Sequence, residues 1–379
     1  MEETNKEALE LHRKHSGKLQ IKSKVPLKNR RDLSLAYTPG VAAVCEEIAK
    51  DKELAKIYTI KKNTVAVITD GSAILGLGNL GPLAALPVME GKCALLKEFA
   101  DVDAFPICLD TEDTETIINT IKYIAPVFGG INLEDISAPR CFEIERRLKK
   151  ELDIPVMHDD QHGTAVVVLA GLINALSLKN LSKERAKIVV NGAGAAGTAI
   201  TKFLIFYGFK NIVVCDKEGA IYENREGLSP EKKELAQITN KDLTAGSLGE
   251  CLRGTDVFIG VSAKDVLTVE MIQQMNPKPA IFALANPYPE IDPVLAKQAG
   301  AFIIATGRSD VPNQVNNILA FPGIFRGALD NNVREITTAL LVKAAENLAA
   351  YVKNPSPEFI LPDPLDKDVV KVVAMAIKN

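Results

Sequence analysis

A glycine-rich turn between an apolar run and a helix-like stretch constrains the fold of this chain more than any other feature. Gly192, Gly194 and Gly197 form the pattern G-x-G-x-x-G, which follows KIVV and precedes TAITKFLIFYGF. The first glycine of such a turn permits a tight bend, the second lets the backbone approach a pyrophosphate, and the third allows the helix to pack closely on the strand. The sequence therefore predicts a Rossmann-type dinucleotide site, with phosphate-binding residues Gly192, Ala193, Gly194, Ala195, Ala196 and Gly197.

Asp216 ends the next apolar run, NIVVCD, nineteen residues after the last glycine. We expect its carboxylate to accept hydrogen bonds from the ribose hydroxyls of the cofactor. A carboxylate in this place repels the extra phosphate of NADP, although Lys217 beside it would partly offset that repulsion. The sequence favours NAD as the cofactor, with NADP as the alternative.

Short apolar runs alternate with helix-period stretches from about residue 63 onward, a pattern typical of parallel βα units. Strands are expected within 63–71, 103–110, 129–136, 154–160, 187–190, 211–216, 255–261, 279–287 and 300–307. Near the C-terminal end, one long amphipathic segment over 325–352 and one short helix over 366–378 are expected. The chain is therefore predicted to have an α/β fold with a doubly wound parallel sheet.

Several of the expected strands run into acidic residues, and ligands of open α/β sheets gather at the carboxyl ends of the strands. The acidic candidates at this edge are Asp70, Asp110, Glu134, Asp135, Asp159 and Asp160. Glu134, Asp135 and Asp160 provide three hard oxygen ligands, which suit Mg²⁺ or Mn²⁺. Solvated acidic loop ends are the alternative interpretation of the same spacing.

Two of the four histidines of the chain, His158 and His162, lie in the pentapeptide HDDQH. A histidine metal site would need a third ligand of this kind, and the chain has no other histidine nearby. We therefore expect the two histidines to frame the loop by hydrogen bonds, while the aspartates between them carry the chemistry.

Composition narrows the choice of partners. The 379 residues carry a formal charge of -3 without a block of like charge. We therefore do not expect nucleic acid or a membrane surface as a partner, and we expect a small molecule as the ligand. The uncharged stretch from Gln161 to Leu178 is expected to be a buried helix and not a membrane span. Six scattered cysteines and a polar N-terminal stretch without a secretory signal favour a cytoplasmic location.

Eight motifs in a fixed order resemble the malic enzyme family: SLAYTPGVA, TDGSAILGLGNLG, GKCALL, INLEDI, HDDQHGTA, GAGAAG, ALANPYPE and NNILAFPG. The resemblance is to the short prokaryotic form and covers nearly the whole chain. It implies an N-terminal malic enzyme α/β domain over 1–162. A Rossmann-type NAD-binding domain with C-terminal helices is implied over 163–379.

The resemblance also implies roles for single residues. Tyr37 of AYTPG corresponds to the general acid and Lys92 of the GK pair to the general base, which Asp159 would hold and tune. Glu134, Asp135 and Asp160 correspond to the metal ligands. The substrate or nicotinamide would face Asn286 and Asn317, and further cofactor contacts are assigned to Gly76, Gly78, Asn79 and Asn286.

The implied activity is oxidative decarboxylation of (S)-malate to pyruvate and carbon dioxide, with reduction of NAD(P). This reaction requires a base for the 2-hydroxyl proton, a hydride acceptor, a Lewis acid and an acid that protonates C3. Decarboxylation of oxaloacetate is a related expectation. The alternatives are a malolactic reaction, in which bound NADH returns its hydride to give lactate, and a non-catalytic dinucleotide sensor.

One motif departs from the family pattern. Larger members have an arginine before ILGLG that clamps a substrate carboxylate, whereas this chain has Ser72 and Ala73 there. Backbone N–H groups within 76–81, or Asn286 and Asn317, are the expected replacements. The resemblance further suggests a homodimer in which the segment that carries Tyr37 crosses to a neighbouring copy.

Overall fold

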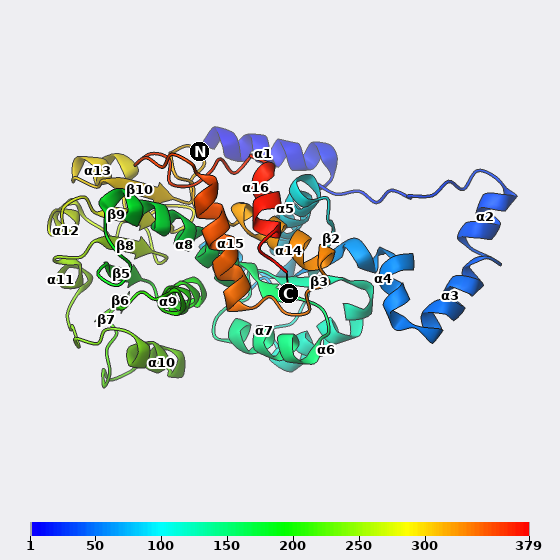
Figure 1. The fold of residues 1–379 in the computed structure, drawn as a ribbon, viewed down its shortest axis with the longest axis horizontal. Helices are drawn as coiled ribbons and strands as arrows, with labels where there is room; N and C mark the ends of the chain where they lie inside the picture. Colours follow the sequence, from blue (N-terminus) through cyan, green and yellow to red (C-terminus); the bar gives the residue numbers. More distant parts are fainter. Residues whose placement is uncertain (1, 379) are drawn as a thin grey trace.

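The computed structural model describes residues 2–378 and contains two sheets of mainly parallel strands (Figure 1). The first sheet has the order β2-β1-β3-β4, and every neighbouring pair is parallel. Its strands are β1 (Thr64–Thr69), β2 (Asp103–Cys108), β3 (Gly130–Leu133) and β4 (Val156–His158). The helices that connect them are α5 (Pro82–Ala100), α6 (Thr114–Ile124) and α7 (Arg140–Glu151).

The second sheet has the order β10-β9-β8-β5-β6-β7 and is parallel except for the last pair. Its strands are β5 (Lys187–Asn191), β6 (Asn211–Asp216), β7 (Gly219–Ala220), β8 (Val257–Gly260), β9 (Ala280–Ala283) and β10 (Ile303–Thr306). Its helices are α9 (Ala195–Tyr207), α10 (Pro230–Ile238), α11 (Leu248–Leu252), α12 (Val269–Gln273) and α13 (Pro293–Gln298). The chain winds in opposite directions from β5, so this is the doubly wound sheet that the sequence predicts, and all expected strands are present.

The helix α8 (Asp159–Lys179) lies in the core that the two sheets share. Its length and apolar composition match those of a membrane span, but 72% of its most apolar window is buried inside the protein. The expectation of a buried helix is thus confirmed. The predicted domain boundary at residues 162 and 163 falls in the first turn of this helix, and the domain limits themselves stay a prediction.

Three C-terminal helices complete the body: α14 (Phe321–Asp330), α15 (Thr338–Tyr351) and α16 (Asp368–Ala374). The prediction of one long amphipathic segment over 325–352 is wrong, because the chain turns between α14 and α15. Asn332 adopts a left-handed conformation with φ of 47°, and the Thr337 side chain caps the new helix by accepting from the Leu340 N–H. α14 packs against α5 and α15 against α8, so the end of the chain contacts both halves (Figure 1).

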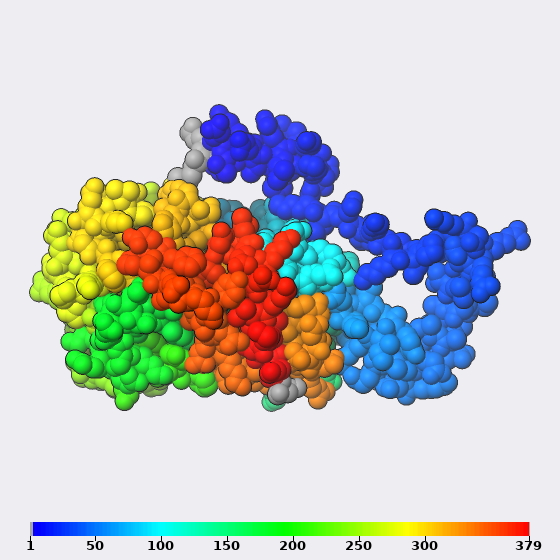
Figure 2. All heavy atoms as spheres, turned by 45° about the horizontal axis from the view of Figure 1, so that its top comes forward, coloured from blue at the N-terminus to red at the C-terminus, as the bar shows by residue number. Residues whose placement is uncertain are grey.

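The N-terminal part of the chain is built differently. After α1 (Glu2–His15), an extended stretch leads to α2 (Arg30–Ala36), α3 (Val41–Lys50) and α4 (Ala55–Tyr58), none of which contains a buried residue. Residues 19–58, which we call the arm, touch the body at both ends, where Lys24 pairs with Asp103 and α4 lies near the first sheet. The middle of the arm, with α2 and α3, stands out from the body (Figures 1 and 2). Short 3-10 turns lie at η1 (Lys52–Leu54), η2 (Ile60–Asn63), η3 (Ile74–Gly76), η4 (Ala125–Val127) and η5 (Asn317–Leu319).

Candidate active site

Three carboxylates meet where β3 ends and α8 begins. Glu134 and Asp135 follow β3, Asp160 is the second residue of α8, and one oxygen from each lies within 4.8 Å of the others. The Asp135 backbone N–H donates to Asp160 Oδ2 over 2.8 Å, which ties the loop after β3 to the start of α8. This set of oxygen ligands could hold a divalent cation.

The electrostatics of the cluster also suit a cation. Burial and the neighbouring Asp160 raise the pKa of Glu134 well above its usual value, and the same two causes raise the pKa of Asp135 to about 7. Asp135 Oδ2 is buried without a hydrogen-bond partner among the described residues. Buried carboxylates that repel one another are stabilised by a bound cation, so the donor set fits Mg²⁺ or Mn²⁺.

Lys92 projects from α5 into the same cluster and is 8% exposed. Its Nζ lies 2.9 Å from Glu134 Oε1 and donates a short hydrogen bond to Asp159 Oδ2. Burial lowers the pKa of Lys92, but Asp159 and Glu134 outweigh burial and the net pKa is raised. Burial also raises the pKa of Asp159 to about 6. The lysine is therefore held in its charged form by two carboxylates.

These groups face a cavity of about 560 Å³ between the two sheets. Lys92, Glu134, Asp135 and Asp160 line one side of it. The opposite side consists of the start of α9, at 194–196, and of loops that carry Asn286 and Asn317. The structure thus brings the predicted base, metal ligands, phosphate loop and both asparagines to one space.

The phosphate loop has the backbone that the glycine pattern predicts. Gly192 has φ of 120°, and a Cβ there would lie 2.5 Å from the Val261 carbonyl oxygen. A Cβ at Gly197 would lie 1.8 Å from the Gly192 carbonyl oxygen, so only glycine permits the close approach of α9 to its strand. Gly194 precedes the first turn of α9, whose N–H groups are free to bind phosphate.

Comparison with known proteins decides the family. Residues 16–149 match the family model for the malic enzyme N-terminal domain, and residues 161–379 match the model for the malic enzyme NAD binding domain. The chain belongs to the malic enzyme family.

Relatives of this malic enzyme match it over nearly its whole length. It is 56% identical over 374 residues to the bifunctional malic/malolactic enzyme of Bacillus subtilis, covering 98% of this chain and 91% of that protein. The NAD-dependent malic enzyme of Geobacillus stearothermophilus is 56% identical over 363 residues, with coverage of 95% and 76%. The crystal structure of the NAD-dependent malic enzyme from Thermotoga maritima superposes with a TM-score of 0.95 at 53% identity, covering 98% of this chain and 99% of that one.

Asp216 of this malic enzyme does not stand alone at the end of β6. Its Oδ2 accepts hydrogen bonds from Arg225 Nη2 and from Lys232 Nζ, each over 2.6 Å. Burial would raise the pKa of Asp216, but these bonds outweigh burial and lower the pKa to about 2. Lys217, which sequence reasoning placed in the neutralising role, is exposed. Arg225 and Lys232 come from the segment around α10, where no sequence pattern pointed to them.

Tyr37 lies outside the cavity of its own chain. It caps the C-terminal end of α2 in the arm and is 66% exposed. The arm carries it away from the body, so one copy of this malic enzyme does not bring Tyr37 to Lys92 (Figure 1).

The ILGLGNLG turn contributes only part of its predicted cofactor contacts. Gly76 lines the cavity, where a Cβ would lie 2.9 Å from the Asn286 carbonyl oxygen. Gly78 and Asn79 do not line it, and Asn79 Nδ2 donates to Glu112 Oε1 over 2.6 Å. Ser72, which with Ala73 stands at the position of the family's arginine, accepts from the Ser137 N–H over 2.9 Å and so joins this turn to the loop that follows Asp135. No arginine among the described residues lines the cavity.

The two histidines of HDDQH have unequal roles in this malic enzyme. His162 Nε2 lies 2.8 Å from Oε1 of the buried Glu145, which also accepts the His158 backbone N–H over 3.1 Å. Neither ring nitrogen of His158 has a hydrogen-bond partner among the described residues, although Nδ1 lies 3.7 Å from Asp160 Oδ2. The expected framing by hydrogen bonds thus holds for the His162 ring only, and Glu145 is the residue that sequence reasoning missed.

Two further residues lie beside Lys92 and its partner Asp159. A Cβ at Gly163 would lie 1.9 Å from Asp159 Oδ1, so the glycine that follows HDDQH leaves room for this carboxylate. The Lys92 Nζ lies 4.7 Å from the centroid of the Phe321 ring, at the start of α14. The glycine was visible in the motif HDDQHG, whereas nothing in the sequence connected Phe321 with Lys92.

Proposed function

We propose that this malic enzyme oxidatively decarboxylates (S)-malate to pyruvate and carbon dioxide with reduction of NAD(P). One observation carries the proposal: a buried lysine and a three-carboxylate cluster share a cavity with the phosphate-binding turn of a dinucleotide fold. A base, a cation site and a hydride acceptor are thereby available to one small molecule. The names of the relatives support the same reaction.

Lys92 is the proposed base for the 2-hydroxyl proton. In its neutral form Nζ accepts that proton, and the charged form is then stabilised by Asp159 and Glu134. Asp159 also fixes the position of Nζ, because its carboxylate is fully buried and cannot turn toward solvent. Loss of the proton from C2–OH allows the hydride on C2 to move to the nicotinamide.

Glu134, Asp135 and Asp160 are the proposed ligands of Mg²⁺ or Mn²⁺. When bound, the cation polarises the 2-oxygen and stabilises the negative charge that develops as carbon dioxide leaves. The side-chain amides of Asn286 and Asn317 line the same cavity and would orient the substrate carboxylates. Because the described part of the chain brings no arginine to this lining, amide and backbone N–H donors are the proposed replacement for the family's clamp.

Tyr37 is the proposed acid for C3, and it would act in the cavity of a second copy. A phenol keeps its proton at neutral pH and is suited to donate it to the enol carbon of the product. Leu33 and Leu35, on the same short segment, are 52% and 67% exposed. Three large exposed side chains so close together, Tyr37 among them, are unusual for a surface that faces only water. A homodimer in which each arm crosses to the partner would bury these residues and complete both cavities.

The proposed cofactor is NAD, with NADP as the alternative. Asp216 favours a ribose with free hydroxyls, yet the carboxylate is already paired with Arg225 and Lys232. These two cations would attract a 2′-phosphate if Asp216 released them. Preference between the cofactors therefore depends on how firmly Asp216 holds its partners.

An assay of products separates this function from its alternatives. Malate, NAD and Mn²⁺ are incubated with the enzyme, and NADH, pyruvate and lactate are measured together. NADH and pyruvate in equal amounts are expected. Lactate without NADH would establish the malolactic reaction, which the name of the Bacillus subtilis relative keeps as the second candidate. Carbon dioxide release from oxaloacetate without NAD tests the related decarboxylation. Binding of the nucleotide without turnover of malate would indicate a non-catalytic dinucleotide sensor.

We also propose a cytoplasmic setting without nucleic-acid or membrane partners. The formal charge of -3 supports the proposed absence of nucleic-acid and membrane partners, because it offers no attraction to polyanions. The free thiols of all six cysteines support a reducing compartment. Fractionation of cells that express the chain would test the location.

A further inference from the structure

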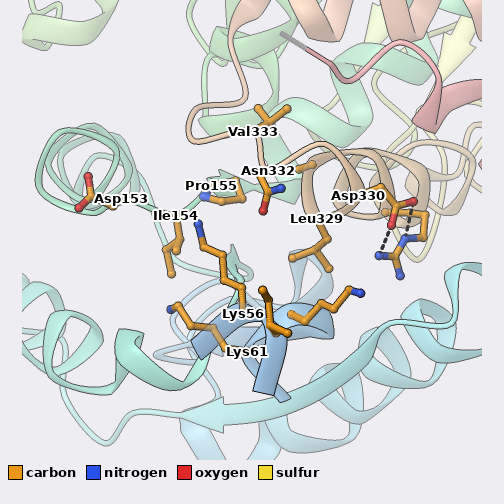
Figure 3. Close-up of a pocket in the computed structure, with 14 residues that line it drawn as sticks. Lys56, Lys61, Asp153, Ile154, Pro155, Leu329, Asp330, Asn332 and Val333 are labelled. Atoms are coloured by element: carbon orange, nitrogen blue, oxygen red, sulfur yellow. Dashed lines mark hydrogen bonds and ion pairs between the residues drawn. The ribbon is translucent and has the colours of Figure 1, made fainter. Parts of the chain in front are cut away.

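A second cavity, of about 540 Å³, lies at the other end of the first sheet from the active site. It borders Gly129 and Pro155, which precede β3 and β4, whereas the catalytic acids follow these strands. Its floor is formed by α4 and η2, where the arm joins the body, and its roof by the turn between α14 and α15 (Figure 3). None of the groups proposed for catalysis lines this cavity.

Three lysines, Lys56, Lys61 and Lys62, line the floor. Lys56 extends toward Pro155 across the cavity, as Figure 3 shows. The half-buried Lys61 donates to the Phe128 carbonyl oxygen over 2.6 Å and to that of Ala125 over 3.3 Å. Burial lowers the pKa of Lys61, and the nearby Lys56 lowers it further. The lysines thus concentrate positive charge in a partly desolvated place.

The two acidic side chains that line the cavity are already paired with arginines. Asp330 holds the Arg326 guanidinium through two bonds, of 3.0 Å and 2.6 Å, and Asp153 pairs with Arg334 over 2.6 Å. Lys56 pairs with Glu53, whose side chain is 76% exposed and does not line the cavity. Within residues 2–378, neither Lys61 nor Lys62 forms an ion pair with a carboxylate. The cavity therefore attracts an anion.

The chemistry of the cationic side chains distinguishes among anions. A planar carboxylate is best bound by the two-pronged guanidinium of arginine. Arg326, the one arginine that lines the cavity among residues 2–378, is already held by Asp330. The remaining cations are ammonium groups, which act as point charges and suit a tetrahedral phosphate. The Asn332 side chain lies opposite the lysines in Figure 3 and adds a polar group on the far side.

The other walls of the cavity are apolar. Ile154 and Pro155 form one of them, and Leu329 and Val333 form another, while Ile57 lies among the lysines. A bare phosphate would leave these surfaces exposed to water, whereas an organic group attached to it would cover them. The volume is in the range of small-ligand sites.

We propose that this cavity binds a small organic phosphate monoester, with its phosphate on Lys56, Lys61 and Lys62 and its apolar part against Ile154, Pro155, Leu329 and Val333. The ligand would contact the base of the arm, the first sheet and the C-terminal helices at the same time. Its binding would stabilise the arrangement of these three parts.

Calorimetric titration of the full chain with phenyl phosphate tests the proposal, in the presence of saturating NAD so that the nucleotide site is filled. We expect one phenyl phosphate per chain, with inorganic phosphate about tenfold weaker because it covers no apolar surface. Lys56→Gln and Lys62→Gln should each weaken both probes about tenfold. Leu329→Ala, in the wall placed against the apolar part, should weaken phenyl phosphate and leave inorganic phosphate unchanged.

Lys50→Gln is the matched control, since Lys50 lies on the same arm, pairs with Glu47 over 2.7 Å and is outside the cavity. Unfolding temperatures of the variants without ligand, expected to agree with that of the parent chain, show that any loss is local. Absence of heat with both probes would overturn the proposal. So would binding that persists unchanged in both lysine variants, because the phosphate would then occupy another place.

Discussion

Lys92 and Glu134 form a buried ion pair, although the first is the proposed base and the second a proposed ligand of the cation. The Nζ atom lies 2.9 Å from Glu134 Oε1, and the Glu134 carboxylate also belongs to the cluster where a divalent ion fits. A cation that draws electron density from Glu134 weakens one of the charges that raise the pKa of Lys92. We therefore expect cation binding at this cluster to make Lys92 a more effective base.

Replacement of Lys92 by alanine should abolish hydride transfer and leave nucleotide binding intact. The 2-hydroxyl proton then has no acceptor, and a loss of at least about a hundredfold in turnover is expected. NADH formation from malate and equilibrium binding of NAD are the two measurements. Lys97→Ala, an exposed lysine on the same helix, is the control. Malate turnover within a few fold of the parent would remove Lys92 from this role.

Asp160→Asn should weaken Mn²⁺ binding by at least about tenfold, since it removes a charged ligand from a three-carboxylate set. Free Mn²⁺ is counted by electron paramagnetic resonance during titration, without any substrate. Asp110→Asn, an exposed carboxylate after β2 and outside the cluster, serves as the control. If both variants bind Mn²⁺ as the parent does, the cluster is not its site.

A mixture of two inactive variants tests whether the arm serves a neighbouring copy. Tyr37→Phe and Lys92→Ala chains are combined, allowed to exchange subunits and assayed with malate. If Tyr37 acts across the dimer, a mixed dimer has one complete site, and activity should rise to about a quarter of the parent level. If Tyr37 acts within its own chain, every site keeps one defect and the mixture stays inactive.

Cofactor choice should respond to Asp216 and its two partners in opposite directions. Asp216→Asn loosens Arg225 and Lys232, so the ratio of kcat/KM for NADP to that for NAD should rise about tenfold. Arg225→Ala should lower the same ratio, because one cation that could hold the 2′-phosphate is lost. Lys217→Ala, beside Asp216 but exposed, should leave the ratio unchanged. A ratio that is equal in all three variants would show that cofactor choice is made elsewhere.

Glu145→Gln should destabilise the fold most at neutral pH. Burial would raise the pKa of Glu145, but His162 and Lys149 outweigh burial and hold it below its usual value. Its ionised form therefore adds stability above the pKa of about 4.3 in the unfolded chain, and this contribution is lost as pH falls through the folded value. We expect a loss of about 3 kcal/mol at pH 7.

Urea unfolding of Glu145→Gln and of the parent, at pH 7 and again near pH 4, checks this prediction. The difference in the free energy of unfolding should shrink at the lower pH. Glu143→Gln, half exposed on the same helix, should have little effect at either pH. A loss that does not depend on pH would indicate that the shape of Glu145 matters and its charge does not.

The sequence alone is sufficient to predict the features of the fold that depend on local patterns of apolar and acidic residues. Alternating apolar runs predicted every strand except β7, whose two residues are too few to show a period. Glu134 and Asp160 could be assigned to one metal site from the sequence because each follows a strand of the same sheet. The two strands, β3 and β4, are parallel neighbours, and acidic residues that follow such strands lie at one edge of the sheet.

What the sequence left open depends on contacts between distant segments. Arg225 and Lys232 reach Asp216 only because the chain after β7 folds back over the end of β6. In the sequence, nothing distinguishes Glu145 from the other acidic residues of its amphipathic helix. Its burial beside HDDQH follows from the packing of α7 on β4. The exposed position of Tyr37 depends on the path of the arm, which no periodicity encodes.

The helix α8 carries Asp159 and Asp160 in its first turn and packs along the rest of its length between the two halves of the chain. Consider a hybrid enzyme made from two family members that are joined at residue 162. It would take Asp159 and Asp160 from one parent, and it would take the rest of α8, which orients them, from the other. A join within 180–186, in the loop before β5, keeps both on one parental segment. In this family, recombination is therefore expected to succeed at the end of α8 and to fail near its start.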